Sequence, residues 1–227
     1  DAPLVLLGER IQDAGIPHFS MDNVSAASEM VHHLYQQGAR SFLILGSTHT
    51  RATSSAGALR QRGIEKALSE LGLDSWAWRS VEVSPWTAEG AESALGQWLE
   101  SNTLPDAIFT MNDLLGAGAL RALSRAQVRV PQDVLVSSWD DTVLSRFSTP
   151  ALTTISPDTH AIAHEAVAGL IALIEGSART GDPGEAKGPD TDTTETANPA
   201  HHNQPSTQVS DVTVSYTLTV RESTKRV

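Results

Sequence analysis

The feature that most constrains the fold of this chain is a regular alternation of short apolar runs with longer amphipathic stretches. The apolar runs are PLVLLG (3–8), SFLILGS (41–47), RSVEVS (79–84), DAIFTM (106–111), DVLVSSW (133–139) and VTVSYTLTV (212–220). Most are continuous, as is typical of strands covered on both faces. Helical periodicity occupies residues 23–37, 56–71, 87–100, 112–126 and 159–174. This alternation predicts an α/β fold with parallel, doubly wound sheets and right-handed crossovers.

One segment, residues 177–207, differs from the rest because it contains no Val, Ile, Leu, Met, Phe, Trp, Tyr or Cys. It is instead rich in Pro, Gly, Thr, Asp and Glu. A segment of this composition cannot bury enough apolar surface to offset the entropy lost on ordering. We therefore predict that residues 177–207 form a disordered surface insertion.

The composition argues against several classes of function. The 227 residues carry a formal net charge of −11. This charge disfavours direct binding to DNA or to an anionic membrane, because both need clustered Lys and Arg. The absence of cysteine excludes disulfides and thiol chemistry. No apolar run approaches the roughly 20 residues that span a bilayer, and no secretion signal is visible. We expect a soluble, cytoplasmic protein, and the start at Asp1 rather than Met suggests a processed or truncated product.

Polar or aromatic residues directly follow four of the predicted strands. They are residues 48–51, Trp86, Asn112 with Asp113, and Asp140 with Asp141. In open α/β sheets, ligands bind beyond the carboxyl ends of the strands. We therefore expect these side chains to converge on one rim of a sheet and to face a ligand.

The adjacent residues Asp140 and Asp141 suit binding better than catalysis. Neighbouring residues at a strand end point in opposite directions, so the two carboxylates cannot face each other as an acid–base dyad. We expect one of them to face the ligand and the other to hold a turn. The sequence also contains no nucleophile-elbow motif. It therefore predicts no catalytic residues, and a binding protein rather than an enzyme.

Two cofactor hypotheses match only part of their motifs. The sequence GAGAL at Gly116 follows a predicted strand, and Asp140 ends the next one, but Arg121 replaces the third glycine of a dinucleotide fingerprint. His160 and His164 have helical i, i+4 spacing, but no Glu follows the first His as it does in zincins. We expect neither a cofactor nor a metal.

Taken in order, the motifs resemble the effector-binding core of LacI/GalR-type (lactose-repressor-like) transcription regulators. The matching stretches are PLVLLG, MDNVSAASEMVHHLYQQGARSFLILGS, ALRQRGIEKAL, WTAEGAESAL, DAIFTMNDLLGAGALRAL, VPQDVLVSSWDDTVLSRFSTPALTTISPD and LTVREST. Their order and spacing are more specific than any one of them. The resemblance implies a two-lobed, periplasmic-binding-protein-like (type I) fold, with an N-terminal lobe that is incomplete in this chain and a small effector in the cleft.

The resemblance also implies an effector-binding site made of Arg60, Trp86, Asn112 and Asp140. From the residues alone, Arg60 could also be a solvated helix arginine, although Arg62 fits that description better, and Trp86 is equally a core residue. In a binding site, a guanidinium donates hydrogen bonds in a fork, and a carboxylate accepts from two hydroxyls. An amide does both, and an indole covers an apolar face of the ligand. The resemblance assigns the ligand position to Asp140, the first acid of the pair, and leaves Asp141 to the turn.

By the same resemblance the chain divides into five parts. They are a partial N-terminal lobe (1–22), a C-terminal lobe (23–156), a return helix of the N-terminal lobe (157–176), the insertion (177–207) and a last strand that crosses back to the C-terminal lobe (208–227).

The function that the resemblance implies is that of a homodimeric transcription regulator that senses a small polar metabolite, such as a sugar or nucleoside. Operator DNA would be bound only through a helix-turn-helix headpiece that is absent from this chain, and no membrane partner is implied. A periplasmic sugar-binding protein of a transporter shares the fold and is the main alternative. A nicotinamide-dependent enzyme is a third interpretation, which the incomplete glycine motif disfavours.

Overall fold

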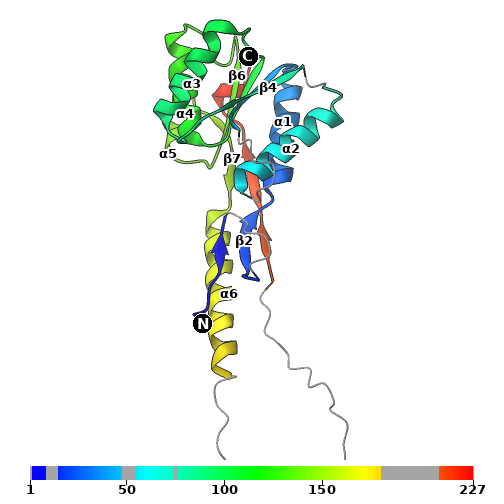
Figure 1. Cartoon of the computed structure of the whole chain (residues 1–227), viewed down its shortest axis with the longest axis vertical. Coiled ribbons are helices and arrows are strands. Elements are labelled where there is room, and N and C mark those ends of the chain that lie inside the picture. Colours follow the sequence, from blue (N-terminus) through cyan, green and yellow to red (C-terminus); the bar gives the residue numbers. More distant parts are fainter. Residues whose placement is uncertain (1, 9–14, 48–54, 74–75, 180–209, 227) are drawn as a thin grey trace, which may run out of the picture.

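The computed structural model describes residues 2–8, 15–47, 55–73, 76–179 and 210–226. These residues form two β-sheets with helices packed against them (Figure 1). The chain crosses from one sheet to the other after β2, after β7 and between β8 and β9. The predicted α/β class is confirmed, and parallel pairing predominates in both sheets.

The larger sheet has six strands in the order β4-β3-β5-β6-β7-β9. They are β3 (Phe42–Ser47), β4 (Trp78–Glu82), β5 (Ala107–Thr110), β6 (Leu135–Trp139), β7 (Thr153–Pro157) and β9 (Tyr216–Thr219). Neighbouring strands are parallel except for β7 and β9, which pair antiparallel. Every residue of β3, β5 and β6 is buried, which explains why these strands lack an alternation of polar and apolar residues.

Two helix pairs flank the larger sheet. Helix α1 packs on α2, and α3 packs on α4, with the two pairs on opposite sides in Figure 1. Their bounds are α1 (Asn23–Gln36), α2 (Ala56–Glu70), α3 (Ala88–Ser101) and α4 (Asp113–Arg125), and the short α5 (Val143–Phe147) follows β6. The bounds of α1 to α4 lie within one residue of the predicted ones, and α5 was not predicted.

The smaller sheet has three parallel strands in the order β1-β2-β8. They are β1 (Leu6–Leu7), β2 (His18–Met21) and β8 (Val212–Val214). Helix α6 (Thr159–Arg179) packs beside these strands and extends past them, away from the larger sheet (Figure 1). A 3-10 turn, η1 (Glu222–Thr224), closes the chain against the larger sheet. In the described part of the chain, no helix combines the length and the apolar character needed to cross a membrane.

The last predicted strand differs most from the structure. Residues 212–220 form one apolar run, but Val212–Val214 pair with β2 of the smaller sheet, and Tyr216–Thr219 pair with β7 of the larger one. Ser215 lies at the crossing, where its carbonyl accepts a hydrogen bond from the amide of Asp158 at 3.2 Å. A local apolar pattern cannot distinguish one long strand from two short strands in different sheets.

Three smaller differences concern element bounds. The strand predicted at residues 3–8 is reduced to Leu6–Leu7. Strands β2 and β7 were not among the predicted apolar runs, because both mix apolar residues with buried polar ones. Helix α6 continues to Arg179, so residues 177–179 are helical rather than disordered. The remainder of the predicted insertion lies outside the described residues.

Candidate functional site

A cavity of about 350 Å³ lies where the two sheets meet. Both sheets and the segments that join them contribute its lining residues, which are Gly8, Met21, Asn23, Ala56, Gly57, Arg60, Trp86, Asn112, Asp140, Pro157, Thr159 and Ile162. All four residues predicted to bind an effector are among them. Side chains that follow the carboxyl ends of the strands therefore meet at one cavity, as expected for an α/β sheet. Residues 48–51, which were predicted at the same rim, lie outside the described residues.

Arg60 is buried near the start of α2, and several groups hold its guanidinium. Its Nε donates to Oδ1 of Asn23 at 3.0 Å, and its Nη1 donates to the carbonyl of Met111. The guanidinium also stacks on Trp139, with Cζ 4.3 Å from the ring centroid. Only 9% of Arg60 is exposed, so it is not a solvated helix arginine, whereas Arg62 is exposed. The orientation of the Arg60 guanidinium is therefore fixed by protein groups.

Asp140 presents a carboxylate that is only partly satisfied by the protein. Its Oδ1 lies 3.7 Å from Nη2 of Arg60, beyond direct hydrogen-bond distance, and 41% of its side chain is exposed. Among the described residues, no group donates a hydrogen bond to this carboxylate. Burial raises the pKa of Asp140, the charge of Arg60 partly opposes that rise, and the charge of Asp113 adds to it. The site thus retains an acceptor that a ligand hydroxyl can use.

Asp141 belongs to a different network. Its Oδ1 accepts from Nη2 of Arg221 at 2.6 Å and from Oγ of Ser145 at 3.3 Å. The two aspartates therefore point to different partners, but the predicted reason is wrong. Strand β6 ends at Trp139, and Asp140 and Asp141 have φ of 101° and 51°. A left-handed turn, rather than strand alternation, separates the two carboxylates.

The buried carboxylate of Asp113 fixes this turn. Its Oδ2 accepts from both the amide (2.6 Å) and the hydroxyl (2.8 Å) of Thr142, and its Oδ1 accepts from the hydroxyl of Ser138. Asp113 is 1% exposed, and these bonds satisfy its charge. The position of Asp140 therefore depends on Asp113. The sequence pattern grouped Asp113 with its neighbour Asn112 and did not assign the two residues different roles.

The Asn112 side chain both caps a helix and lines the cavity. Its Oδ1 accepts from the amide of Leu115 at 2.9 Å, which caps the N-terminus of α4. Among the described residues, its Nδ2 has no hydrogen-bond partner. Asn112 can therefore donate to a ligand through Nδ2, while one of the two lone pairs of its Oδ1 is used by the helix cap.

Trp86 fits both of its proposed roles. It lies between β4 and α3, just before Thr87, whose Oγ1 accepts from the amide of Gly90 at 3.0 Å and caps α3. The indole is partly buried against the core and also lines the cavity. One side of Trp86 is therefore anchored, and the cavity side is available for stacking.

Asn23 is the main polar residue that the sequence analysis missed. It is 4% exposed, begins α1 immediately after the Met21–Asp22 crossing, and contacts Arg60. A sequence signal was present, because Asn23 is a polar residue between a strand and a helix, as Asn112 is. The strand before Asn23 mixes apolar and polar residues and is not one of the continuous apolar runs, so the pattern of polar residues after such runs did not include Asn23.

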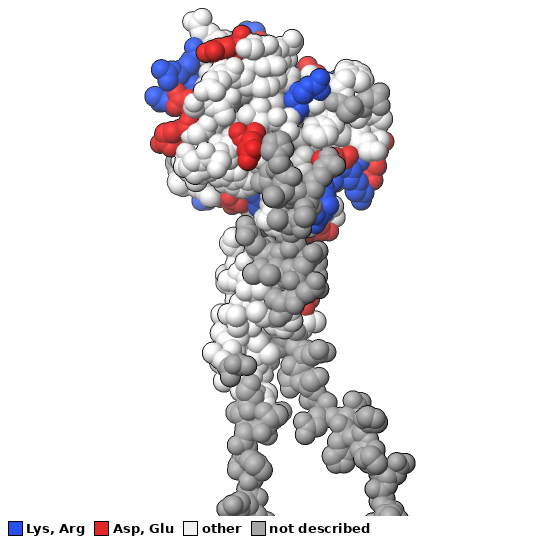
Figure 2. All heavy atoms as spheres, viewed as in Figure 1, with Lys and Arg blue, Asp and Glu red and all other residues white. Residues whose placement is uncertain are grey.

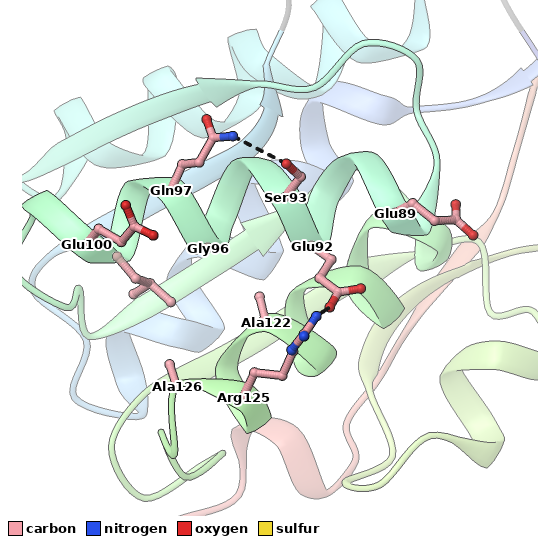
Figure 3. Close-up of a pocket in the computed structure, with 10 residues that line it drawn as sticks. Glu89, Glu92, Ser93, Gly96, Gln97, Glu100, Ala122, Arg125 and Ala126 are labelled. Carbon is pink, nitrogen blue, oxygen red and sulfur yellow. Dashed lines mark hydrogen bonds and ion pairs between the residues drawn. The ribbon is translucent and has the colours of Figure 1, made fainter.

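Two larger hollows lie elsewhere on the larger-sheet part. One, of about 660 Å³, runs between α3 and α4, where Figure 3 shows Glu92 reaching toward Arg125. Glu92 accepts from Arg125 at 2.6 Å and pairs with Nε of Arg121 at 3.0 Å. The other, of about 650 Å³, lies between α4 and α5. Neither contains a predicted site residue, and both are grooves between surface helices, so size alone does not identify the site.

The charges in the described residues indicate binding of a polar organic molecule. Among the described residues, the lining of the cavity combines the Arg60 guanidinium, the Asp140 carboxylate, the side-chain amides of Asn23 and Asn112, and the Trp86 indole. No group of three or more His, Asp or Glu side chains in the described residues is arranged to hold a metal ion. On the face shown in Figure 2, Lys and Arg residues are interspersed with Asp and Glu residues rather than gathered in one patch.

Comparison with known proteins supports the same interpretation. Residues 31–189 match the periplasmic binding protein-like domain family. The helix-turn-helix (HTH)-type transcriptional repressor CytR of Escherichia coli (strain K12) is 28% identical over 180 residues, which is 77% of this chain and 50% of CytR. The HTH-type transcriptional repressor PurR of Haemophilus influenzae (strain PittEE) is 31% identical over 149 residues, 63% of this chain and 41% of PurR. The chain spans about half the length of the curated relatives it matches.

Solved structures show the same likeness over a larger share of the chain. A structure from Sanguibacter keddieii DSM 10542, assigned to the LacI family of transcriptional regulators, is 32% identical with a TM-score of 0.76. The match covers 98% of this chain and 73% of that one. The relatives with an assigned role are transcription regulators rather than enzymes. The chain therefore belongs to the periplasmic binding protein-like domain family, as the effector-binding core of a LacI-type transcription regulator.

Proposed function

We propose that the cavity between the two sheets binds a small polar metabolite, a sugar or a nucleoside, through Arg60, Trp86, Asn112 and Asp140. The observation that carries this proposal is the convergence of these four side chains on one cavity of about 350 Å³. That volume lies within the roughly 300–1,000 Å³ of small-molecule sites.

Each side chain has a distinct task in the proposed complex. Asp140 accepts hydrogen bonds from ligand hydroxyls, and Nη2 of Arg60 and Nδ2 of Asn112 donate. Trp86 covers an apolar face of the sugar or base. Hydrogen bonds to charged groups contribute about 1.5–3 kcal/mol each, so Asp140 and Arg60 carry the largest shares of the affinity.

We propose that binding regulates transcription by shifting the relative arrangement of the two sheets. The cavity is lined from both sheets, so a ligand that fits one arrangement better changes the population of that arrangement. Operator binding is assigned to a helix-turn-helix headpiece outside this chain, and the protein acts in the cytoplasm. Because the curated relatives are HTH-type repressors, they favour a regulator over a transporter-binding protein.

We propose that the two sheets mark two lobes with the sequence-predicted bounds. Residues 1–22 and 157–176 then belong to one lobe, residues 23–156 to the other, and residues 208–227 join them. The sheet order supports this division, because β1, β2 and β8 share one sheet while β3 to β7 and β9 share the other.

We also propose that the protein is a homodimer that pairs through α4 and α5. Phe147 is 82% exposed on α5, beside the groove of about 650 Å³. The apolar residues of this face are Ala117, Leu120, Val143, Leu144 and Phe147. A protruding aromatic ring beside an apolar groove on the same face suits a two-fold, self-complementary contact.

Light scattering on Phe147→Asp tests the dimer. The wild type should have twice the mass of the chain, and the variant should have the monomer mass. Val167→Asp, at an exposed apolar position of α6, is the matched control and should remain dimeric. A monomeric wild type, or a dimer that survives Phe147→Asp, contradicts this interface.

A ligand screen tests the effector proposal. Thermal shift and calorimetry should be carried out with D-glucose, D-galactose, D-ribose, adenosine and uridine. We expect at least one sugar or nucleoside to bind, and we expect Asp140→Asn to weaken that binding. Glu100→Gln, an exposed carboxylate-to-amide change on α3, should leave it unchanged. If sugars and nucleosides fail to bind, or if Asp140→Asn binds them as tightly as the wild type, the proposed site is wrong.

A further inference from the structure

We infer that Asn23 is a positioning residue that sets the orientation of Arg60 and links it to the first crossing between the sheets. Asn23 is buried at the first turn of α1, two residues after β2 ends at Met21. Its Oδ1 accepts from Nε of Arg60 at 3.0 Å, and its Nδ2 donates to the carbonyl of Met21 at 3.3 Å. One amide thus joins a residue of α2 to the last residue of a strand in the smaller sheet.

The side chain of Asn23 is not required to cap its own helix. Asp22 caps α1, because its Oδ1 accepts from the amide of Ser25 at 3.0 Å and its Oδ2 accepts from the hydroxyl of Ser25 at 2.6 Å. Capping of α1 therefore accounts for the side chain of Asp22. Both polar atoms of the Asn23 side chain remain available to form hydrogen bonds with Arg60 and Met21. An amide supplies one acceptor and one donor group at this reach, whereas Asp lacks the donor and Ser is too short.

Asn23 decides which edge of the Arg60 guanidinium faces the cavity. The Met111 carbonyl and the Trp139 ring hold Arg60 within the larger-sheet part. With Nε fixed on Asn23 and Nη1 on Met111, Nη2 is directed toward Asp140. Without the Asn23 acceptor, Nε loses this hydrogen bond, so one fewer contact sets the direction of Nη2.

The consequence for ligand binding rests on the proposed function. A ligand that engages Asp140 and Nη2 of Arg60 fixes the guanidinium further, and Asn23 passes this constraint to the Met21 carbonyl. Met21 and Asn23 also line the cavity themselves. The contacts Asp140–Arg60–Asn23–Met21 thus connect the site to the crossing after β2.

The positioning role can be tested without any ligand. The exchange rate of the Arg60 Nε proton is measured by NMR on protein labelled at arginine, with Arg60→Lys identifying the signal. We expect Asn23→Leu and Asn23→Ser to raise this rate at least tenfold, because a buried hydrogen bond protects the proton. Asn23→Asp should preserve the slow rate, since it keeps the acceptor.

Asn102→Leu is the matched control, because Asn102 is exposed and its Nδ2 donates to the Trp98 carbonyl on α3. It should leave the Arg60 rate unchanged. A folded Asn23→Leu or Asn23→Ser variant whose rate stays within twofold of the wild type overturns the positioning role. If Asn23→Leu does not fold, Asn23→Ser provides the same test of the positioning role.

The link to the crossing has a separate readout. With a sugar or nucleoside that binds, hydrogen–deuterium exchange of residues 21–24 should slow at least fivefold in the wild type. At a concentration of that compound that saturates both proteins, this slowing should be lost in Asn23→Asp, because Asp lacks the donor to Met21. Equal slowing in both proteins overturns the link. If no compound binds, the proposed function fails, while the Arg60 proton still decides the positioning role.

Discussion

The neighbouring residues Asp140 and Asp141 should respond in opposite ways to removal of their carboxylates. Oδ1 of Asp141 lies 2.6 Å from Nη2 of Arg221, and their side chains are 19% and 17% exposed. Breaking a fully buried pair costs roughly 3–5 kcal/mol. Arg221 retains a hydrogen bond to the Leu152 carbonyl at 2.9 Å, and the pair is partly solvated. We therefore expect Asp141→Ala to cost about 2–3 kcal/mol in the free energy of unfolding.

Asp140→Ala should cost much less stability and much more affinity. Its carboxylate is 41% exposed and lies 3.7 Å from Arg60, and exposed pairs contribute about 0–1 kcal/mol. At about 2–4 °C per kcal/mol, Asp141→Ala should lower Tm by roughly 4–12 °C, and Asp140→Ala by less than about 4 °C. Loss of charged hydrogen bonds to the ligand should weaken binding at least tenfold in Asp140→Ala. Asp141→Ala should change Kd by no more than about threefold.

The assay combines scanning calorimetry with titration calorimetry, the latter well below the Tm of Asp141→Ala and with a sugar or nucleoside that binds the wild type. The expected pattern is a crossed one, in which one variant loses stability and the other loses affinity. If Asp141→Ala weakens binding more than Asp140→Ala, the assignment of the two acids is reversed. If Asp140→Ala unfolds at the lower temperature, the estimate from the ion-pair geometry is wrong.

Three further predictions concern packing and ionisation. Gly63→Ala should cost about 1–3 kcal/mol in the free energy of unfolding, because a Cβ there would clash with the α1 backbone. Gly96→Ala should instead stabilise α3 by about 0.5–1 kcal/mol, because a Cβ there meets nothing within 4 Å. Thermal unfolding of both variants checks this. Burial, and then a hydrogen bond to Glu29, raise the pKa of Tyr216 to about 12 from 10.0. The unfolded chain therefore releases this proton first, so stability should fall as pH rises through that range, and Tyr216→Phe should remove that part of the loss in denaturant titrations. Burial raises the pKa of Asp140, so its ionisation disfavours the folded state, and stability should fall as pH rises from the ordinary aspartate value through the raised one. Asp140→Asn should lack this contribution in the same titrations.

Strands covered on both faces could be predicted from the sequence, but strands completed by distant polar contacts could not. Strand β6 is an apolar run whose every residue is buried. Strand β7 has buried threonines, and the hydroxyl of Thr153 contacts the hydroxyl of Thr224 at 2.7 Å and accepts from the amide of Arg221 at 2.8 Å. These partners are 71 and 68 residues away in the chain. A local sequence pattern shows that these residues are polar, but it does not show which distant groups form hydrogen bonds with them.

The same limit applies to the candidate site. The carboxyl-end rule and the family resemblance together named four residues that line one cavity. The contacts that orient Arg60 were not predictable, because Asn23 and Met111 lie 37 and 51 residues from it in sequence. The capping bond of Asn112 was predictable in principle, since Asn before a helix usually accepts from the backbone. That local role uses one of the two lone pairs of the Asn112 amide oxygen.

The two aspartates at the end of β6 connect the cavity to two of the three crossings of the chain, the one after β2 and the one between β8 and β9. Asp140 faces Arg60, whose Nε is held by Asn23 at the crossing after β2. Asp141 pairs with Arg221, which follows β9, the strand that the chain enters directly from β8 of the smaller sheet. Both residues have left-handed φ, so the turn directs one carboxylate to each of two segments that arrive from the smaller sheet. We therefore expect a change in the relative position of the sheets to alter the surroundings of Asp140, which would allow a ligand at this carboxylate to sense that arrangement.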